Sequence, residues 1–164
     1  MNKKIAILVV SCDAYSDLWP IFFGLWFKYW PTCSHKIYLG SNYKKFNHND
    51  INMINIGEDL DYSSNLIKML NEIDEDRVII LCEDVFLSDF VDDGNMQTFY
   101  NEFERKDAAY LKLIQTYPLG YNKDISHKIA SVPPGIKYRV GVGLALWNKD
   151  ILLENQDEIH IPAF

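Results

Sequence analysis

The chain has 164 residues, a length typical of one domain, and 16 Lys and Arg against 23 Asp and Glu give it a formal net charge of −7. This acidic balance argues against a nucleic-acid-binding protein, because such proteins neutralise phosphates with a basic face. A hydrophobic content of 48% and a charged content of 24% are those of a globular domain and exclude wholesale disorder. Cys12, Cys33 and Cys82 are far apart, which predicts free thiols rather than disulfides or a zinc site.

The apolar runs are too short for a secretory leader or a membrane span. Ile5–Val10 has six residues, fewer than the roughly 7–15 apolar residues of a signal peptide. The longest apolar run, Leu18–Phe27, has ten residues, and a bilayer requires about 20. We therefore expect a mature, cytoplasmic protein.

Strands and helices alternate along the first half of the chain. The uninterrupted, β-branched run Ile5–Val10 predicts a central strand that is covered on both faces. Apolar residues at helical spacing predict an aromatic helix over Leu18–Trp30, with Ser16 as its N-cap. Two further short strands are expected at His35–Leu39 and Ile51–Ile56.

The second half continues the alternation and contains a long loop. A buried strand is expected at Val78–Cys82, and the alternating pattern of Tyr138–Trp147 suggests a late strand antiparallel to its neighbours. Residues 115–136 are expected to form a long irregular loop. The other expected elements are a helix capped by Asp61 or Ser63, a helix capped by Asp92 or Asp93, a strand at Ala109–Ile114 and a short helix from Asn148.

This order predicts the fold class. Strands that alternate with helices favour an α/β domain with a largely parallel, mixed sheet flanked by helices, a Rossmann-like nucleotide-binding core. Residues 1–164 are expected to form this single domain. Ligands bind such sheets beyond the carboxyl ends of the strands, where the strand order reverses. Ser11-Cys12-Asp13 and Glu83-Asp84 each follow a predicted buried strand, so we expect them to converge there.

Glu83 and Asp84 are the strongest candidates for a chemical role. Mg²⁺ is commonly held by one or two carboxylates together with substrate phosphates. A carboxylate pair that leaves a buried strand is therefore suited to fixing a metal against a diphosphate. The alternative is that these acids merely end the strand.

Other polar residues are weaker candidates. Ser11 and Asp13 are suited to hydrogen bonds with the base or ribose of a nucleotide, although a loop that caps the aromatic helix explains them equally well. The sequence has neither a G-x-G-x-x-G nor a Walker A motif. Arg139 is suited to neutralising a phosphate leaving group, and Trp147 to forming the floor of a sugar site. For these two, a solvated charge and a core tryptophan are the alternatives.

Several stretches resemble nucleotide-sugar glycosyltransferases of the GT-A fold. The run from Asp59 through Leu87 is similar to the heart of that fold, in which a helix beginning "s-x-x-N" precedes a strand that ends in an acidic "DxD"-like motif. A bacterial subgroup linked to capsule and lipopolysaccharide synthesis has further similar stretches. Their counterparts here are Lys28–Pro31 (KYWP), Ile37–Gly40 (IYLG), Ile80–Leu87 (ILCEDVFL) and Tyr138–Ile151 (YRVGVGLALWNKDI).

The resemblance implies roles for particular residues. It puts Asp84, with Glu83, at the metal and diphosphate position. It also puts Ser11 and Asp13 near the nucleotide, Asp59, Ser63 and Asn65 on the donor side of the cleft, and Arg139 and Trp147 on the acceptor side. The chain departs from the family at Cys82, where a strict DxD motif has its first aspartate, and at Phe164, because the family continues with a further Trp- and Glu-containing segment.

The sequence thus predicts a metal-dependent, hexosyltransferase-like enzyme of surface polysaccharide synthesis. It would move a sugar from a nucleoside-diphosphate-sugar donor to a glycan or lipid-linked acceptor, with Mn²⁺ or Mg²⁺ stabilising the leaving group. The helix Leu18–Trp30 would contact a partner subunit or the cytoplasmic side of a membrane, or lie buried under the domain's own loops. The alternative function is a nucleotide- or sugar-binding module of the same fold that does not turn over.

Overall fold

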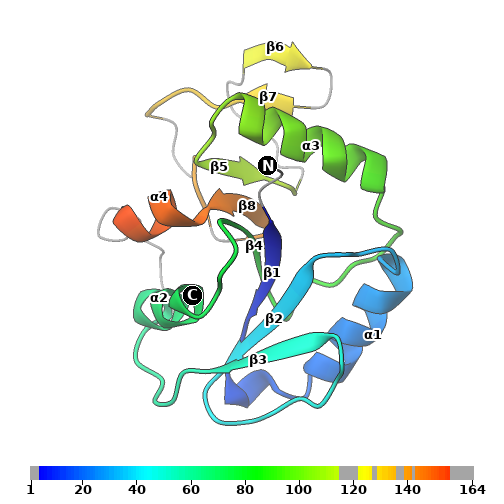
Figure 1. Cartoon of the computed structure of the whole chain (residues 1–164), viewed down its shortest axis with the longest axis vertical. Coiled ribbons are helices and arrows are strands. Elements are labelled where there is room, and N and C mark those ends of the chain that lie inside the picture. The colour runs from blue at the N-terminus through cyan, green and yellow to red at the C-terminus, as the bar shows by residue number, and fades with distance from the viewer. Residues whose placement is uncertain (1–3, 115–121, 127–128, 136–138, 142, 156–164) are drawn as a thin grey trace.

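A computed structural model describes residues 4–114, 122–126, 129–135, 139–141 and 143–155 (Figure 1). Its centre is a six-stranded sheet of order β3-β2-β1-β4-β8-β5. The strands of this sheet are β1 (Ile5–Val10), β2 (Lys36–Ser41), β3 (Ile51–Asn55), β4 (Arg77–Cys82), β5 (Tyr110–Lys112) and β8 (Ala145–Asn148). The helices are the 3₁₀ turn η1 (Asp13–Tyr15), α1 (Trp19–Tyr29), α2 (Tyr62–Asn71), α3 (Asp93–Arg105) and α4 (Lys149–Glu154).

The sheet is mixed, which confirms the predicted fold class. β1 pairs in parallel with β2 and β4, and β2 pairs in parallel with β3. β8 is antiparallel to both β4 and β5, as its alternating sequence suggested. The first four strands therefore end at one edge, which we call the carboxyl edge. It comprises the loops that begin at Ser11, Asn42, Ile56 and Glu83. We call the opposite edge, where these strands begin, the amino edge.

Two helical layers cover the sheet (Figure 1). Successive side chains of a strand point to opposite faces, so Ile7 and Val9 pack with the aromatic side chains of α1 and with Phe103 of α3, whereas Leu8 packs with α2 and α4. Four α1 side chains are buried in this way: Trp19, Phe22, Phe23 and Trp26. The aromatic helix is thus largely covered by the protein itself, although Ile21 remains 54% exposed. No helix in the described part of the chain is long and apolar enough to cross a membrane.

The helix starts agree with the sequence at three of four positions. The Asp61 carboxylate caps α2 by accepting from Ser64 N at 2.9 Å, and Asp92 caps α3 in the same way through Asn95 N. Asn148 precedes α4 as expected. The prediction for Ser16 is wrong. α1 begins after Leu18 without a side-chain cap, and the Ser16 hydroxyl accepts from Lys44 Nζ instead.

The late part of the chain differs most from expectation. Within the expected loop 115–136 the structure has a two-stranded hairpin, β6 (Asn122–Ser126) with β7 (Ile129–Ser131). The segment NKDIS of β6 has no apolar alternation, so the sequence carried no signal for it. The late strand begins at Ala145 rather than Tyr138, which lies outside the described residues. Gly141 and Gly143 weaken strand structure at this point.

Candidate functional site

Glu83 and Asp84 form a turn directly after β4, on the carboxyl edge. The turn is closed by a hydrogen bond from Val85 N to the Cys82 carbonyl at 3.1 Å. Although the two carboxylates are adjacent in sequence, their environments differ, because Glu83 is only 6% exposed and Asp84 faces solvent. Since β4 lies beside β1 at the point where the strand order reverses, this turn occupies the predicted ligand position of the sheet.

Glu83 is a buried acid that pairs with no cation of the described residues. Burial raises the pKa of its carboxyl group and the Asp84 carboxylate raises it further, while its own backbone N–H and the Ser11 hydroxyl lower it in part. No ion pair joins Glu83 to a cation among the residues that the structure describes. A buried carboxylate without a cation is unfavourable for stability unless it takes up a proton, so Glu83 is a candidate for a chemical role.

Tyr62 and Cys82 lie beside this acid. The Tyr62 hydroxyl, in the first turn of α2, is buried without a well-formed hydrogen bond in the described residues. Burial raises its pKa strongly, and Cys82 and Glu83 raise it further. Burial, with the two carboxylates, also raises the pKa of the Cys82 thiol to about 11, so this cysteine is a poor nucleophile.

Asp13 joins two loops of the carboxyl edge. Its carboxylate accepts from the Ser41 hydroxyl at 2.7 Å and from the backbone N–H groups of Tyr43 and Lys44 at 3.1 and 2.9 Å. Burial alone would raise the pKa of this carboxyl group, but these hydrogen bonds outweigh it and lower the pKa. The carboxylate that the sequence proposed for a nucleotide is therefore engaged within the protein. Ser11 lies at the same edge, where its Oγ accepts from Trp19 Nε1 at 2.8 Å.

Asp59, Ser63 and Asn65 also lie on the carboxyl edge. The buried Asn65 amide donates to Asp59 Oδ1 at 2.5 Å and accepts from Leu60 N at 3.4 Å, which holds the loop between β3 and α2. Asp59 is exposed, and Ser63 lies half-buried in the first turn of α2. The structure thus brings these residues to the same edge as Glu83 and Asp84.

Trp147 and Arg139 do not join this group. Trp147 pairs with Val78, close to the start of β4, and is buried with its ring 4.5 Å from that of Tyr110. It therefore lies in the core, which was the alternative to a sugar site in the sequence analysis. Arg139 is exposed, and its Nε donates to the Val132 carbonyl at 2.9 Å.

The carboxylates limit how a metal could be bound. No group of three or more His, Cys, Asp or Glu side chains in the described residues is arranged to hold a metal ion. A site made of protein ligands alone is therefore not present there. Asp84, with Glu83 behind it, fits the weaker mode in which Mg²⁺ is held by one or two carboxylates and completed by substrate phosphates and water.

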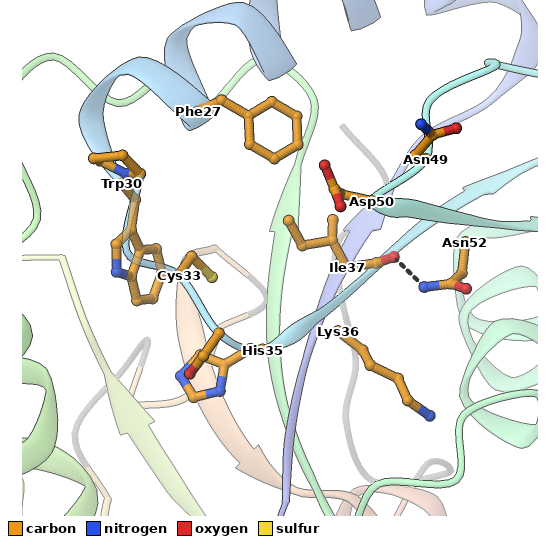
Figure 2. A pocket seen from close by; sticks show the side chains of 11 residues that line it. Phe27, Trp30, Cys33, His35, Lys36, Ile37, Asn49, Asp50 and Asn52 are labelled. Carbon is orange, nitrogen blue, oxygen red and sulfur yellow. Dashed lines mark hydrogen bonds between the residues drawn. The ribbon is translucent and has the colours of Figure 1, made fainter.

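The amino edge has a cavity of about 400 Å³ (Figure 2). It lies between the end of α1 and the starts of β2 and β3, where Figure 2 shows Phe27, Trp30, Cys33 and Asp50 around it. Burial raises the pKa of the Cys33 thiol, so this thiol is not activated. The cavity gathers no buried charge, and we place the candidate site at the carboxyl edge.

Sequence reasoning missed the exposed apolar side chains of the carboxyl edge. Each of the loops that follow the four parallel strands carries at least one, namely Tyr15, Tyr43, Leu60 and Phe86, and the loop after β4 also carries Phe90 farther along the chain. An apolar residue in a loop gives no periodic signal, so only the topology shows that the four belong to one edge.

The fold is shared with a solved enzyme structure. The bifunctional IspDF from Campylobacter jejuni matches with a TM-score of 0.53 at 15% sequence identity, over 94% of this chain and 43% of the IspDF chain. The chain thus spans less than half the length of that protein. No protein-family model matches the sequence, and no curated protein matches it at a significant level.

The expected membership of the GT-A glycosyltransferases, with its role in capsule or lipopolysaccharide synthesis, is wrong. The fold likeness is to IspDF, and no family match supports sugar transfer. The motifs misled for a physical reason. IYLG belongs to the buried strand β2, the first residues of ILCEDVFL belong to the largely buried strand β4, and Trp147 is a core residue. Such segments indicate an α/β core but carry no information about the reaction that a protein catalyses.

Proposed function

We propose that this chain is a nucleotide-binding enzyme domain, with the nucleotide phosphates and a divalent cation at the Glu83-Asp84 turn. The observation that carries the proposal is a buried, unpaired carboxylate beside an exposed one, at the reversal point of a Rossmann-like sheet. Ligands of open α/β sheets bind at this position. The likeness of the fold to the bifunctional IspDF supports an enzymatic role in general terms.

A bound cation would explain why two acidic residues stand next to each other in this turn. The exposed Asp84 carboxylate would bind Mg²⁺ or Mn²⁺ directly, and phosphate oxygens of the nucleotide would complete its coordination. The cation would in turn stabilise the ionised form of Glu83, for which the described residues supply no positive charge. Nucleotide, metal and the acidic turn would therefore bind cooperatively.

The reaction that fits this arrangement is displacement at a phosphorus of the bound nucleotide. The acceptor oxygen would release its proton to water and form a bond to the phosphorus, the bond to the bridging oxygen would break, and the departing phosphate or pyrophosphate would take the electron pair. The bound cation would neutralise the charge that develops on this leaving group. Ser11, whose hydroxyl reaches Glu83, would help to orient the phosphates.

Calorimetric titration tests this proposal. ATP, GTP, CTP and UTP are each titrated into the protein with Mg²⁺ and with EDTA, and release of phosphate or pyrophosphate is followed separately. We expect binding that requires the metal and that weakens about ten-fold or more in Asp84→Asn, because one charge-assisted ligand is lost. Asp89→Asn, an exposed acid outside the turn, serves as the matched control and should bind as the wild type does.

The outcomes separate three cases. Metal-dependent binding with slow phosphate or pyrophosphate release supports the enzyme. Metal-dependent binding without any release, in the presence of candidate acceptors, would indicate a binding module. Failure of all four nucleotides to bind, or equal binding by Asp84→Asn, contradicts the proposed site.

A further inference from the structure

Two exposed tyrosines stand on neighbouring loops of the carboxyl edge. Tyr15 ends η1 after β1 and is 55% exposed, and Tyr43 follows β2 and is 67% exposed. β1 and β2 are adjacent parallel strands, so the segments that carry the two tyrosines follow neighbouring strands at the carboxyl edge (Figure 1). Large exposed rings are unfavourable in water, and their grouping commonly marks a binding surface.

Asp13 holds the backbones that carry the two rings together. Its carboxylate receives the Tyr43 and Lys44 N–H groups, and its own N–H donates to Asn42 Oδ1 at 3.0 Å. Lys44 Nζ also links the two segments, because it donates to the Asp13 carbonyl at 3.0 Å and to Ser16 Oγ at 2.7 Å. The segment before Tyr15 and the segment around Tyr43 are thus fixed to each other by these hydrogen bonds.

The far end of the Tyr43 loop is also anchored. Phe46 stacks on Phe23 of α1 with 5.3 Å between ring centroids and meets Trp19 edge-on. The Lys44 carbonyl accepts from Asn55 Nδ2 at 2.9 Å. The loop is therefore rigid although Tyr43 itself projects into solvent. Rigidity of this kind lowers the entropy lost on binding and is typical of a preorganised ligand surface.

We propose that Tyr43, with Tyr15 on the segment after the adjacent strand, is the platform on which the base of the bound nucleotide stacks. This inference rests on the proposed function, since it assumes that the phosphates occupy the Glu83-Asp84 turn. A base offers an aromatic face to match the rings, and stacking on tyrosine does not require any particular base. The two acceptors of Lys44 Nζ are neutral oxygens, so its positive charge remains to attract an anionic ligand.

The inference also gives Asp13 a role. Because its carboxylate is taken up by Ser41, Tyr43 and Lys44, it acts as a positioning residue that orients the platform rather than as a ligand of the nucleotide. Removing it should weaken nucleotide binding through the loop, whereas removing Tyr43 should weaken it through the base alone.

Titrations with and without a base distinguish these contributions. The probes are the nucleoside triphosphate that binds best in the panel above and tripolyphosphate, each with Mg²⁺. We expect Tyr43→Ala to weaken nucleotide binding about ten-fold and to leave tripolyphosphate binding unchanged, and Tyr43→Phe to bind as the wild type does. Phe90→Ala is the matched control, because Phe90 is also 67% exposed but packs against Tyr29, at the amino-edge end of α1.

Failure of this inference differs from failure of the proposed function. If the wild type binds the nucleotide and Tyr43→Ala binds it equally well, the platform is refuted and the phosphate site stands. If Tyr43→Ala weakens tripolyphosphate as much as the nucleotide, Tyr43 acts on the phosphate site and the platform is again refuted. If the wild type binds no nucleotide, both fail. Tyr43→Leu, which keeps the bulk without the aromatic face, should behave like Tyr43→Ala.

Discussion

The two edges of the sheet differ in whether their buried charged side chains form ion pairs. At the amino edge, the buried Glu75 is matched by Lys36 at 2.9 Å and by the Tyr38 hydroxyl at 3.0 Å, and the buried Arg77 is matched by Glu104 at 2.6 Å. At the carboxyl edge, Glu83 is equally buried, and no described cation pairs with it. The paired charges at the amino edge thus stabilise the fold, whereas at the carboxyl edge the proposed function assigns Glu83 to a ligand.

This difference is informative because the two arrangements have different energetic consequences. In a buried ion pair the attraction between the partners offsets part of their desolvation cost, and removing one partner is strongly destabilising. A buried acid without a cation has a raised pKa instead, and perturbed acids of this kind cluster at functional sites. Mutations at the amino edge should therefore lower the free energy of unfolding, whereas mutations of Glu83 and Asp84 at the carboxyl edge should mainly weaken ligand binding.

The largest effect is expected at the amino edge. Glu104→Ala leaves the Arg77 guanidinium, whose side chain is only 3% exposed, without its carboxylate. We expect a loss of about 3 kcal/mol in the free energy of unfolding, measured by urea denaturation. Glu102→Ala removes a carboxylate from the more exposed pair with Arg105 and should leave the midpoint unchanged. A similar small change for both variants would contradict the structural role of the buried pair.

An intermediate effect is expected at the junction of the two carboxyl-edge loops. Asp13→Ala removes the acceptor of the Ser41 hydroxyl and of two backbone N–H groups, which should destabilise the fold by about 1–2 kcal/mol. The folded state lowers the pKa of Asp13. The stabilisation is therefore present above the unfolded pKa, near 3.9, and is lost as the pH falls through the folded value. Asp13→Asn, which keeps one carbonyl oxygen, should lose less in the same urea titrations.

The smallest effect on stability, with the opposite sign, is expected at Glu83. The folded state raises the pKa of this carboxyl group. Its contribution is therefore most favourable below the unfolded pKa and is lost as the pH rises through the folded value. Glu83→Gln should accordingly gain stability relative to the wild type as the pH rises above the unfolded pKa of a glutamate, near 4.3, while it loses metal-dependent nucleotide binding. A stability difference that stays constant with pH would contradict a raised pKa of Glu83 in the folded state.

The sequence predicted the elements whose signal is local. Ile5–Val10 and Val78–Cys82 are apolar because both faces of these strands are buried. Asp61 and Asp92 cap helices because their carboxylates accept from the backbone N–H groups of Ser64 and Asn95, three residues farther along the chain. The carboxyl edge could also be predicted, because it follows from the order of strands and helices.

Other features depend on tertiary contacts that no local pattern carries. Asp13 is engaged by residues about 30 positions along the chain. Trp147 is buried because β8 inserts between β4 and β5, a pairing that its own alternation does not specify. The same limit explains the mistaken resemblance, since core segments of one α/β protein are similar to those of another whatever reaction each performs.

Amide chemical-shift mapping tests the central claim, that the unpaired edge is the ligand-binding edge, most directly. The ¹H–¹⁵N spectrum of the labelled protein is followed as the best-binding nucleoside triphosphate is added with Mg²⁺. The account predicts shifts concentrated at Ser11–Tyr15, Asn42–Lys44 and Glu83-Asp84, with Lys36 and Arg77 at the amino edge unmoved. Shifts that concentrate instead around the amino-edge cavity at Phe27, Cys33 and Asp50 would contradict it.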